Sequence, residues 1–189
     1  WTWGIDAAYR AEIAYRNRDP RVKTIVSDLD LRLGGTYAVG THSVGLAAAL
    51  NVYNQSCDLD FYSPINTIDT YTLTGMGTFY RRFMGNTNKN SGYSSLGWSV
   101  SAQWLPHDSR GLSAQVDYTA FRMGQQLRNF NNITLGYTDN SAVALSASYS
   151  ADLTQMLLFC PRIEGMYATR KGTENLFGTA AGASYDKIG

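Results

Sequence analysis

The feature that most constrains this chain is the alternation of side-chain character over residues 1–16. Apolar residues occupy the odd positions from Trp1 to Tyr15, and polar, charged or small residues occupy the even positions. A β-strand sends successive side chains to opposite faces, whereas a helix would scatter this pattern around its axis. Sixteen residues at about 3.3 Å each extend roughly 50 Å, far more than the usual strand of about five or six residues. The pattern therefore predicts an unusually long amphipathic strand.

The same alternation recurs along the chain, and about ten strands are expected, with ends placed to within two to four residues. The expected strands cover residues 1–16, 25–39, 44–52, 68–83, 96–104, 112–120, 132–138, 143–150, 160–170 and 176–185. Turn-forming residues separate many of them, at 17–21, 40–41, 107–111, 139–141 and 171–174. Short turns make successive strands antiparallel neighbours. No linker divides the chain, so residues 1–189 are expected to form one all-β unit.

Turn lengths predict how the flanking strands pair, because a shift of one residue would move every side chain to the other face. Each predicted register places the apolar positions of one strand opposite the apolar positions of the next, and the polar positions opposite the polar ones. The expected pairs are Arg16 with Val22, Arg10 with Asp28 and Asp6 with Arg32 across turn 17–21, Tyr37 with Val44 across Gly40-Thr41, and Tyr137 with Val143 across Asp139–Ser141.

Composition excludes several classes of protein. Hydrophobic residues make up 44% of the chain and aromatic residues 13%, which is incompatible with intrinsic disorder. The net charge of +1 and the lack of a basic run give no reason to expect nucleic acid. The mean hydropathy is −0.25, and the sequence has no apolar run long enough for a transmembrane helix. Nothing in the sequence predicts a cofactor or a metal site.

Two environments suit a chain of amphipathic antiparallel strands. The polar positions are mostly Ser, Gly, Ala and Thr, whereas a solvent-facing surface would usually carry Lys and Glu. This difference, the strand length and the aromatic residues near strand ends favour a transmembrane antiparallel up-and-down β-barrel. The alternative is a soluble β-barrel that binds an apolar ligand. The aromatic residues expected to face lipid are Trp3, Tyr9, Tyr15, Tyr37, Trp98, Trp104, Tyr118 and Tyr149. Val100, Ala102, Val143 and Leu145 are expected on the same face.

Charged residues of the first two strands lie on the opposite parity. In the predicted register they form a cross-strand ladder that would face the lumen of a barrel. Its role would be to fix the register, or alternatively to line a pore. The ladder consists of Asp6, Arg10, Glu12, Arg16, Asp28, Asp30 and Arg32.

The sequence does not predict an enzyme. His42 and His107 are the two histidines, and both fall in turns without the spacing of a catalytic triad. Cys57 is expected in the connection after the third strand and Cys160 in a connection at the opposite end. This separation argues against a disulfide bond.

The segment YRNRDPRVKTIVSDL at 15–29, followed by TYAVGTHSVGLAAALNVYNQ at 36–55, resembles an uncharacterised outer-membrane β-barrel family of Bacteroidota. Members have no assigned function and are often found beside TonB-dependent receptors. The resemblance extends over most of the chain and implies a role in uptake or in an envelope complex. Since the chain shows no signal sequence and no closing aromatic residue, the resemblance also implies part of a larger barrel, in which the first and last strands would not pair.

The functional expectation is an integral outer-membrane β-barrel that acts as a transport-associated or structural component of the bacterial envelope. Its partners would be membrane lipid and, alternatively, a TonB-dependent receptor or lipoprotein for which the barrel serves as a scaffold. The sequence leaves open the substrate, the existence of a pore, the total number of strands and which loops are extracellular.

Overall fold

The structure is a long antiparallel β-sheet. A computed structural model describes residues 1–62, 71, 73–75, 78–79, 90–108, 110–154 and 157–175. The long strands are β1 (Thr2–Tyr15), β2 (Arg21–Val39), β3 (His42–Asp60), β6 (Asn90–Pro106), β7 (Gly111–Leu127), β8 (Ile133–Thr154) and β10 (Arg162–Glu174). Shorter elements are β4 (Leu73–Gly75), β5 (Thr78–Phe79), β9 (Leu157–Phe159) and the 3-10 turn η2 (Arg128–Phe130).

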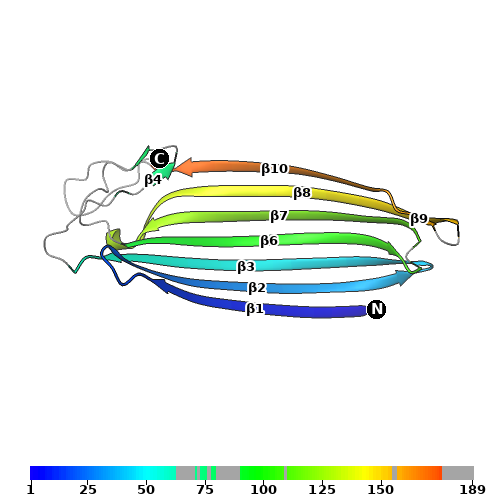
Figure 1. The fold of residues 1–189 in the computed structure, drawn as a ribbon, viewed down its shortest axis with the longest axis horizontal. Helices are drawn as coiled ribbons and strands as arrows, with labels where there is room; N and C mark the ends of the chain where they lie inside the picture. The colour runs from blue at the N-terminus through cyan, green and yellow to red at the C-terminus, as the bar shows by residue number, and fades with distance from the viewer. Residues whose placement is uncertain are drawn as a thin grey trace.

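The strands follow one another across the sheet in the order in which they occur in the chain. The order is β1-β2-β3-β6-β7-β8-β10, with β9 beside β8, while β4 and β5 form a separate hairpin (Figure 1). Every neighbouring pair is antiparallel. This arrangement confirms the predicted all-β, up-and-down fold. Within the described residues, β1 and β10 are the two edges and do not pair with each other.

Both N-terminal hairpins have the registers predicted from their turns. Arg10 lies opposite Asp28 and Asp6 opposite Arg32, as the turn at 17–21 requires. The Arg16 amide donates to the Val22 carbonyl oxygen at 2.9 Å, which closes that turn. Gly40 has φ of 60°, a left-handed conformation that glycine adopts without strain. The register of the second hairpin is confirmed by the pairing of Tyr37 with Val44.

The predicted turn at Asp139–Ser141 is wrong. These residues lie inside β8, which joins the strands expected at 132–138 and 143–150 into one of 22 residues. Tyr137 and Val143 share a face simply because they are an even number of positions apart along one strand, so their common polarity did not require a turn. The polar triplet is extended because β7 and β10 pair with it on either side, and Asp139 also forms an ion pair with Arg122 of β7.

Several other boundaries also differ from the expectation: β3, β6 and β7 extend well beyond the strands expected at 44–52, 96–104 and 112–120. The supposed turn at Lys171–Glu174 continues β10, where its residues pair with Gly136–Asp139 of β8. The single strand expected over 68–83 is broken by the hairpin of β4 and β5, and its remaining residues lie outside those described. The strand expected over 176–185 also lies outside the described residues.

The sheet has very little hydrophobic core of its own. Among the described residues, Leu127 and Leu135 are the buried hydrophobic side chains, and Phe130 packs against them near η2. Most other large apolar side chains lie exposed on one face of the sheet. No helix in the described part of the chain is long and apolar enough to cross a membrane. Backbone hydrogen bonds between strands, rather than a packed interior, therefore hold this sheet together.

We expect Gly136→Ala to loosen the pairing of β8 with β10. A Cβ at Gly136 would lie 2.7 Å from the Thr173 carbonyl oxygen, and this backbone atom cannot move without disturbing the ladder. Overpacking of this kind costs about 1–3 kcal/mol, so amide hydrogen exchange over 168–174 should accelerate by roughly tenfold or more.

The matched control is Gly165→Ala on the same pair of strands. A Cβ at Gly165 would meet no atom within 4 Å, so exchange along β10 should stay close to that of the parent protein. Equal exchange rates in the two variants would contradict the steric explanation.

Candidate functional site

Pairing across the sheet divides its side chains between two faces. One face, here called the apolar face, carries Leu50, Trp98 and Val116 and their neighbours in every second position. The other, here called the polar face, carries Asp28, Ser99 and similar residues. Because the registers match from strand to strand, the two faces stay distinct across most of the sheet. The polar face contains the candidate site.

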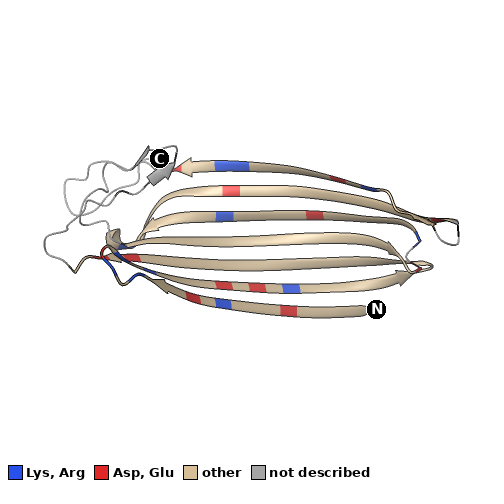
Figure 2. Cartoon of the chain, viewed as in Figure 1, with Lys and Arg blue, Asp and Glu red and all other residues tan. Residues whose placement is uncertain are grey.

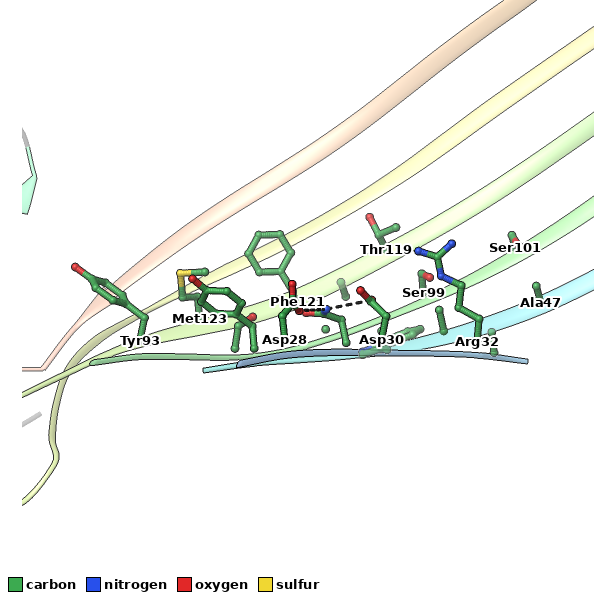
Figure 3. Close-up of a pocket in the computed structure, with 18 of the residues that line it drawn as sticks. Asp28, Asp30, Arg32, Ala47, Tyr93, Ser99, Ser101, Thr119, Phe121 and Met123 are labelled. Carbon is green, nitrogen blue, oxygen red and sulfur yellow. Dashed lines mark hydrogen bonds between the residues drawn. The ribbon is translucent and has the colours of Figure 1, made fainter. Parts of the chain in front are cut away.

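A hollow of about 890 Å³ lies on the polar face. Figure 3 shows side chains of β2, β3, β6 and β7 pointing into it, with the sheet rising around them. Its floor consists largely of Ala, Gly and Ser from β3 and β6, which leave space above the backbone. Larger side chains border this floor: Asp28, Asp30, Arg32, Asn51, Tyr53, Gln55, Tyr93, Thr119, Phe121 and Met123.

A hydrogen-bonded group of three residues forms one wall of the hollow. The Asn51 amide donates to Asp28 Oδ1 at 2.8 Å and to Asp30 Oδ1 at 3.1 Å. Arg10 Nη2 donates to Asp28 Oδ2 at 3.1 Å. One amide thus holds two carboxylates close together, and one guanidinium offsets the charge of the nearer one.

The other residues of the predicted ladder occupy the same face. Asp6 lies opposite Arg32 in register, and Glu12 lies 3.9 Å from Arg10. Figure 2 shows these charges gathered in the middle of β1 and β2, whereas the adjacent β3 and β6 carry none along their central parts. Arg16 follows the last residue of β1 and contributes its backbone amide to the turn. Within the described residues, the ladder forms its cross-strand salt bridge at Arg10–Asp28.

The aromatic residues predicted to face lipid lie on the apolar face. Trp3 is 77% exposed, Tyr9 66% and Trp98 48%, which are high values for side chains of this size. Tyr15, Tyr37, Trp104 and Tyr149 are also exposed, whereas Tyr118 is half-buried against Trp98 with ring centroids 5.1 Å apart. Of the aliphatic residues expected there, Val100 and Leu145 are exposed, and Ala102 and Val143 are half-buried.

Sequence reasoning missed several residues of the hollow. Asn51, Phe121 and Met123 come from strands far apart in the chain, and pairing of β3 with β6 and of β6 with β7 brings them together. Asn51 sits on the polar parity of β3 opposite Asp30, so extending the predicted second hairpin would have located it. No local signal marks Phe121 or Met123, since both are large apolar residues on an otherwise polar face.

The histidines and cysteines lie away from the hollow. His42 begins β3 and stacks near Trp104, with ring centroids 4.9 Å apart, while the His107 amide donates to Thr41 at 2.9 Å. Cys57 lies within β3 rather than after it, because β3 continues to Asp60. Cys160 follows β9 at the opposite end of the sheet, and both cysteines are free.

Comparison with known proteins identifies the chain at the level of a family. Residues 1–189 match the model of a family of unknown function, DUF6850. The chain belongs to this family. No curated protein and no solved structure matches it. The match agrees with the expected membership of a family without an assigned function, and any functional conclusion has to come from the fold and the two faces of this DUF6850 sheet.

The Arg10–Asp28 contact should show a small but measurable coupling energy. Arg10 is 60% exposed and Asp28 19%, so water screens the pair and the coupling should be about 0.2–1 kcal/mol. A double-mutant cycle with Arg10→Gln and Asp28→Asn, read by chemical denaturation, measures it.

The matched cycle replaces Asp28→Asn with Asp30→Asn. Asp30 shares the Asn51 amide but forms no salt bridge with Arg10, so its coupling to Arg10 should be near zero. Coupling of equal size in both cycles would show that the observed geometry does not determine the interaction.

Proposed function

We propose that this chain forms the wall of an integral β-barrel in the outer membrane of Bacteroidota, as a transport-associated or structural component of the envelope. The observation that carries the proposal is the exposed apolar face. Trp, Tyr, Leu and Val side chains cover that face from β1 to β10, while buried hydrophobic residues in the described sheet are confined to the region near η2. A surface of this kind is rare on a protein surrounded by water. In a membrane barrel, lipid would cover this apolar face.

The dimensions of the strands agree with a membrane crossing. On β6 the apolar face carries an uninterrupted series from Leu96 to Trp104, about nine residues, within the range of about 9–11 that a tilted strand needs to cross the hydrocarbon layer. Tryptophan and tyrosine lie at or near both ends of the apolar series on several strands, as is common at membrane–water interfaces. The 17 residues of β6 extend beyond this segment.

The direction of curvature favours a membrane barrel over a soluble one. Figure 3 shows the sheet rising on the side of Asp28, Ser99 and Thr119, which belong to the polar face. A soluble barrel that binds an apolar ligand would curve in the opposite sense and enclose Leu50 and Trp98.

The open edges imply further strands. In the described residues, the outer edges of β1 and β10 have no partner strand, and unpaired backbone groups are costly in lipid. We infer that other residues or another chain complete the sheet. A TonB-dependent receptor or lipoprotein docked to the finished barrel is the scaffold version of this proposal.

Lipid exposure is tested by placing a charge on each face in turn. Val100 lies near the middle of the apolar face and is 45% exposed. Val100→Arg should reduce the fraction of intact protein that folds into phosphatidylcholine vesicles, because arginine at the bilayer midplane costs about 2–4 kcal/mol.

The matched control is Ser99→Arg, one residue away on the polar face. It should insert nearly as well as the parent protein, since its side chain would extend toward the hollow. If both variants inserted equally well, the apolar face would not be in contact with lipid.

A transport role predicts conductance of the intact protein in planar bilayers. The acidic residues of the hollow should then favour cations, and Asp28→Asn with Asp30→Asn should lower the ratio of cation to anion permeability. A silent protein that co-purifies with an envelope partner would instead favour the scaffold role.

A further inference from the structure

Three charged residues interrupt the apolar face. Arg122 of β7 lies opposite Asp139 of β8, and Asp139 lies opposite Lys171 of β10, so the three form one row across the sheet. Figure 2 shows charges side by side at this position on β7, β8 and β10. We call this group the apolar-face cluster. Sequence reasoning missed it because Asp139 and Lys171 were both assigned to turns.

The contacts in the apolar-face cluster leave positive charge available. Arg122 Nε donates to Asp139 Oδ1 at 2.6 Å, and Nη2 donates to Oδ2 at 3.1 Å. This bidentate pairing neutralises Asp139 but uses only part of the hydrogen-bonding capacity of the guanidinium. Lys171 adds a second cation to the single carboxylate. Arg122 remains 64% exposed, so an outside ligand can reach it.

A hollow of about 820 Å³ borders the apolar-face cluster. Trp98, Tyr137 and the hydroxyl-bearing Ser141 and Thr169 are among its other lining residues. Arg122 lies over the Tyr137 ring at 5.5 Å from its centroid. The site therefore combines two cations, which can bind phosphate oxygens, with aromatic and aliphatic surface that includes Trp98 and Leu96. A phospholipid has the same arrangement of headgroup and acyl chains.

The apolar-face cluster lies at the border of the apolar face and not in its middle. Followed across the paired strands from β7 to β2, the row that contains Arg122 ends at Leu29. The charged residue nearest to Leu29 on the apolar face of β2 is Lys23. Lys23 lies about six residues farther along, or roughly 20 Å at about 3.3 Å per residue.

Arg122, Asp139 and Lys171 share one row, so this displacement falls between β2 and β7, which lie three inter-strand spacings of about 4.8 Å apart, or roughly 14 Å. The charged border is thus displaced along the strands between β2 and β7, in keeping with strands that cross a membrane at a tilt. A membrane surface parallel to this border would pass close to both Lys23 and the apolar-face cluster.

We propose that Arg122 and Lys171 bind the phosphate of an anionic lipid headgroup at the membrane surface, with the acyl chains of that lipid lying along Trp98. This inference rests on the proposed function, since it requires the apolar face to be in lipid. It adds a specific lipid contact to what would otherwise be a uniform hydrophobic surface.

The test uses intact protein folded into phosphatidylcholine vesicles that contain a minor fraction of brominated lipid, which quenches nearby tryptophan. Brominated phosphatidylglycerol should quench more strongly than brominated phosphatidylcholine at equal content. Lys171→Gln should lower the preference for the anionic lipid by about fivefold, as expected for one cation near a membrane surface. Trp98→Phe should remove most of the headgroup-dependent quenching, which identifies the reporting residue. Added inorganic phosphate should not compete.

The matched control is Arg170→Gln, which removes the adjacent cation from the opposite face of β10 and should leave the lipid preference unchanged. Equal quenching by the two lipids, or equal loss in the two variants, would overturn the phosphate site while leaving the membrane proposal intact. Absence of quenching by either lipid would instead mean that the apolar face is not in lipid, and the proposed function would fail with it.

Discussion

The structure depends on the continuity of the backbone hydrogen-bond ladder from β1 to β10. Apart from one irregularity between Gln125 and Gln126, the long strands keep their register along their whole paired length. A register error of one residue anywhere would exchange the faces of all strands beyond it. The separation of apolar from polar side chains, the hollow and the charged border are all consequences of this constraint. With so few buried hydrophobic residues, packing could not correct such an error.

The N-terminal half could be predicted closely because its information is local. The turn at 17–21 and Gly40-Thr41 have lengths that determine the pairing, and the alternation on either side is nearly free of exceptions. The region around β8 could not be predicted in the same way. Asp139-Asn140-Ser141 has the composition of a turn, and the partners that keep it extended are distant in sequence: β7 and β10 pair with it on either side, and Arg122 donates to Asp139.

The candidate site likewise has one part that could be predicted from the sequence and one part that could not. The positions of Asp28 and Arg32 opposite Arg10 and Asp6 followed from a single hairpin. Prediction of the hollow would have required the relative positions of four strands. Alternation within one sequence does not show which strands become neighbours across a long connection such as that between β3 and β6. For the same reason, the apolar-face cluster could not be predicted as a group: its residues come from β7, β8 and β10, and only the pairing of these strands brings them into one row.

The distribution of small residues in the hollow has a mechanical consequence. Ala47, Ala49, Gly97 and Ser99 cover the polar face of β3 and β6, while Leu50 and Trp98 project from the other side. A layer with bulky side chains on one surface and small ones on the other is under unequal lateral crowding, and it relieves this by bending toward the thinner side. The side-chain volumes thus favour one sense of curling in the sheet. Filling the floor with larger residues would flatten it even if every polar group were kept.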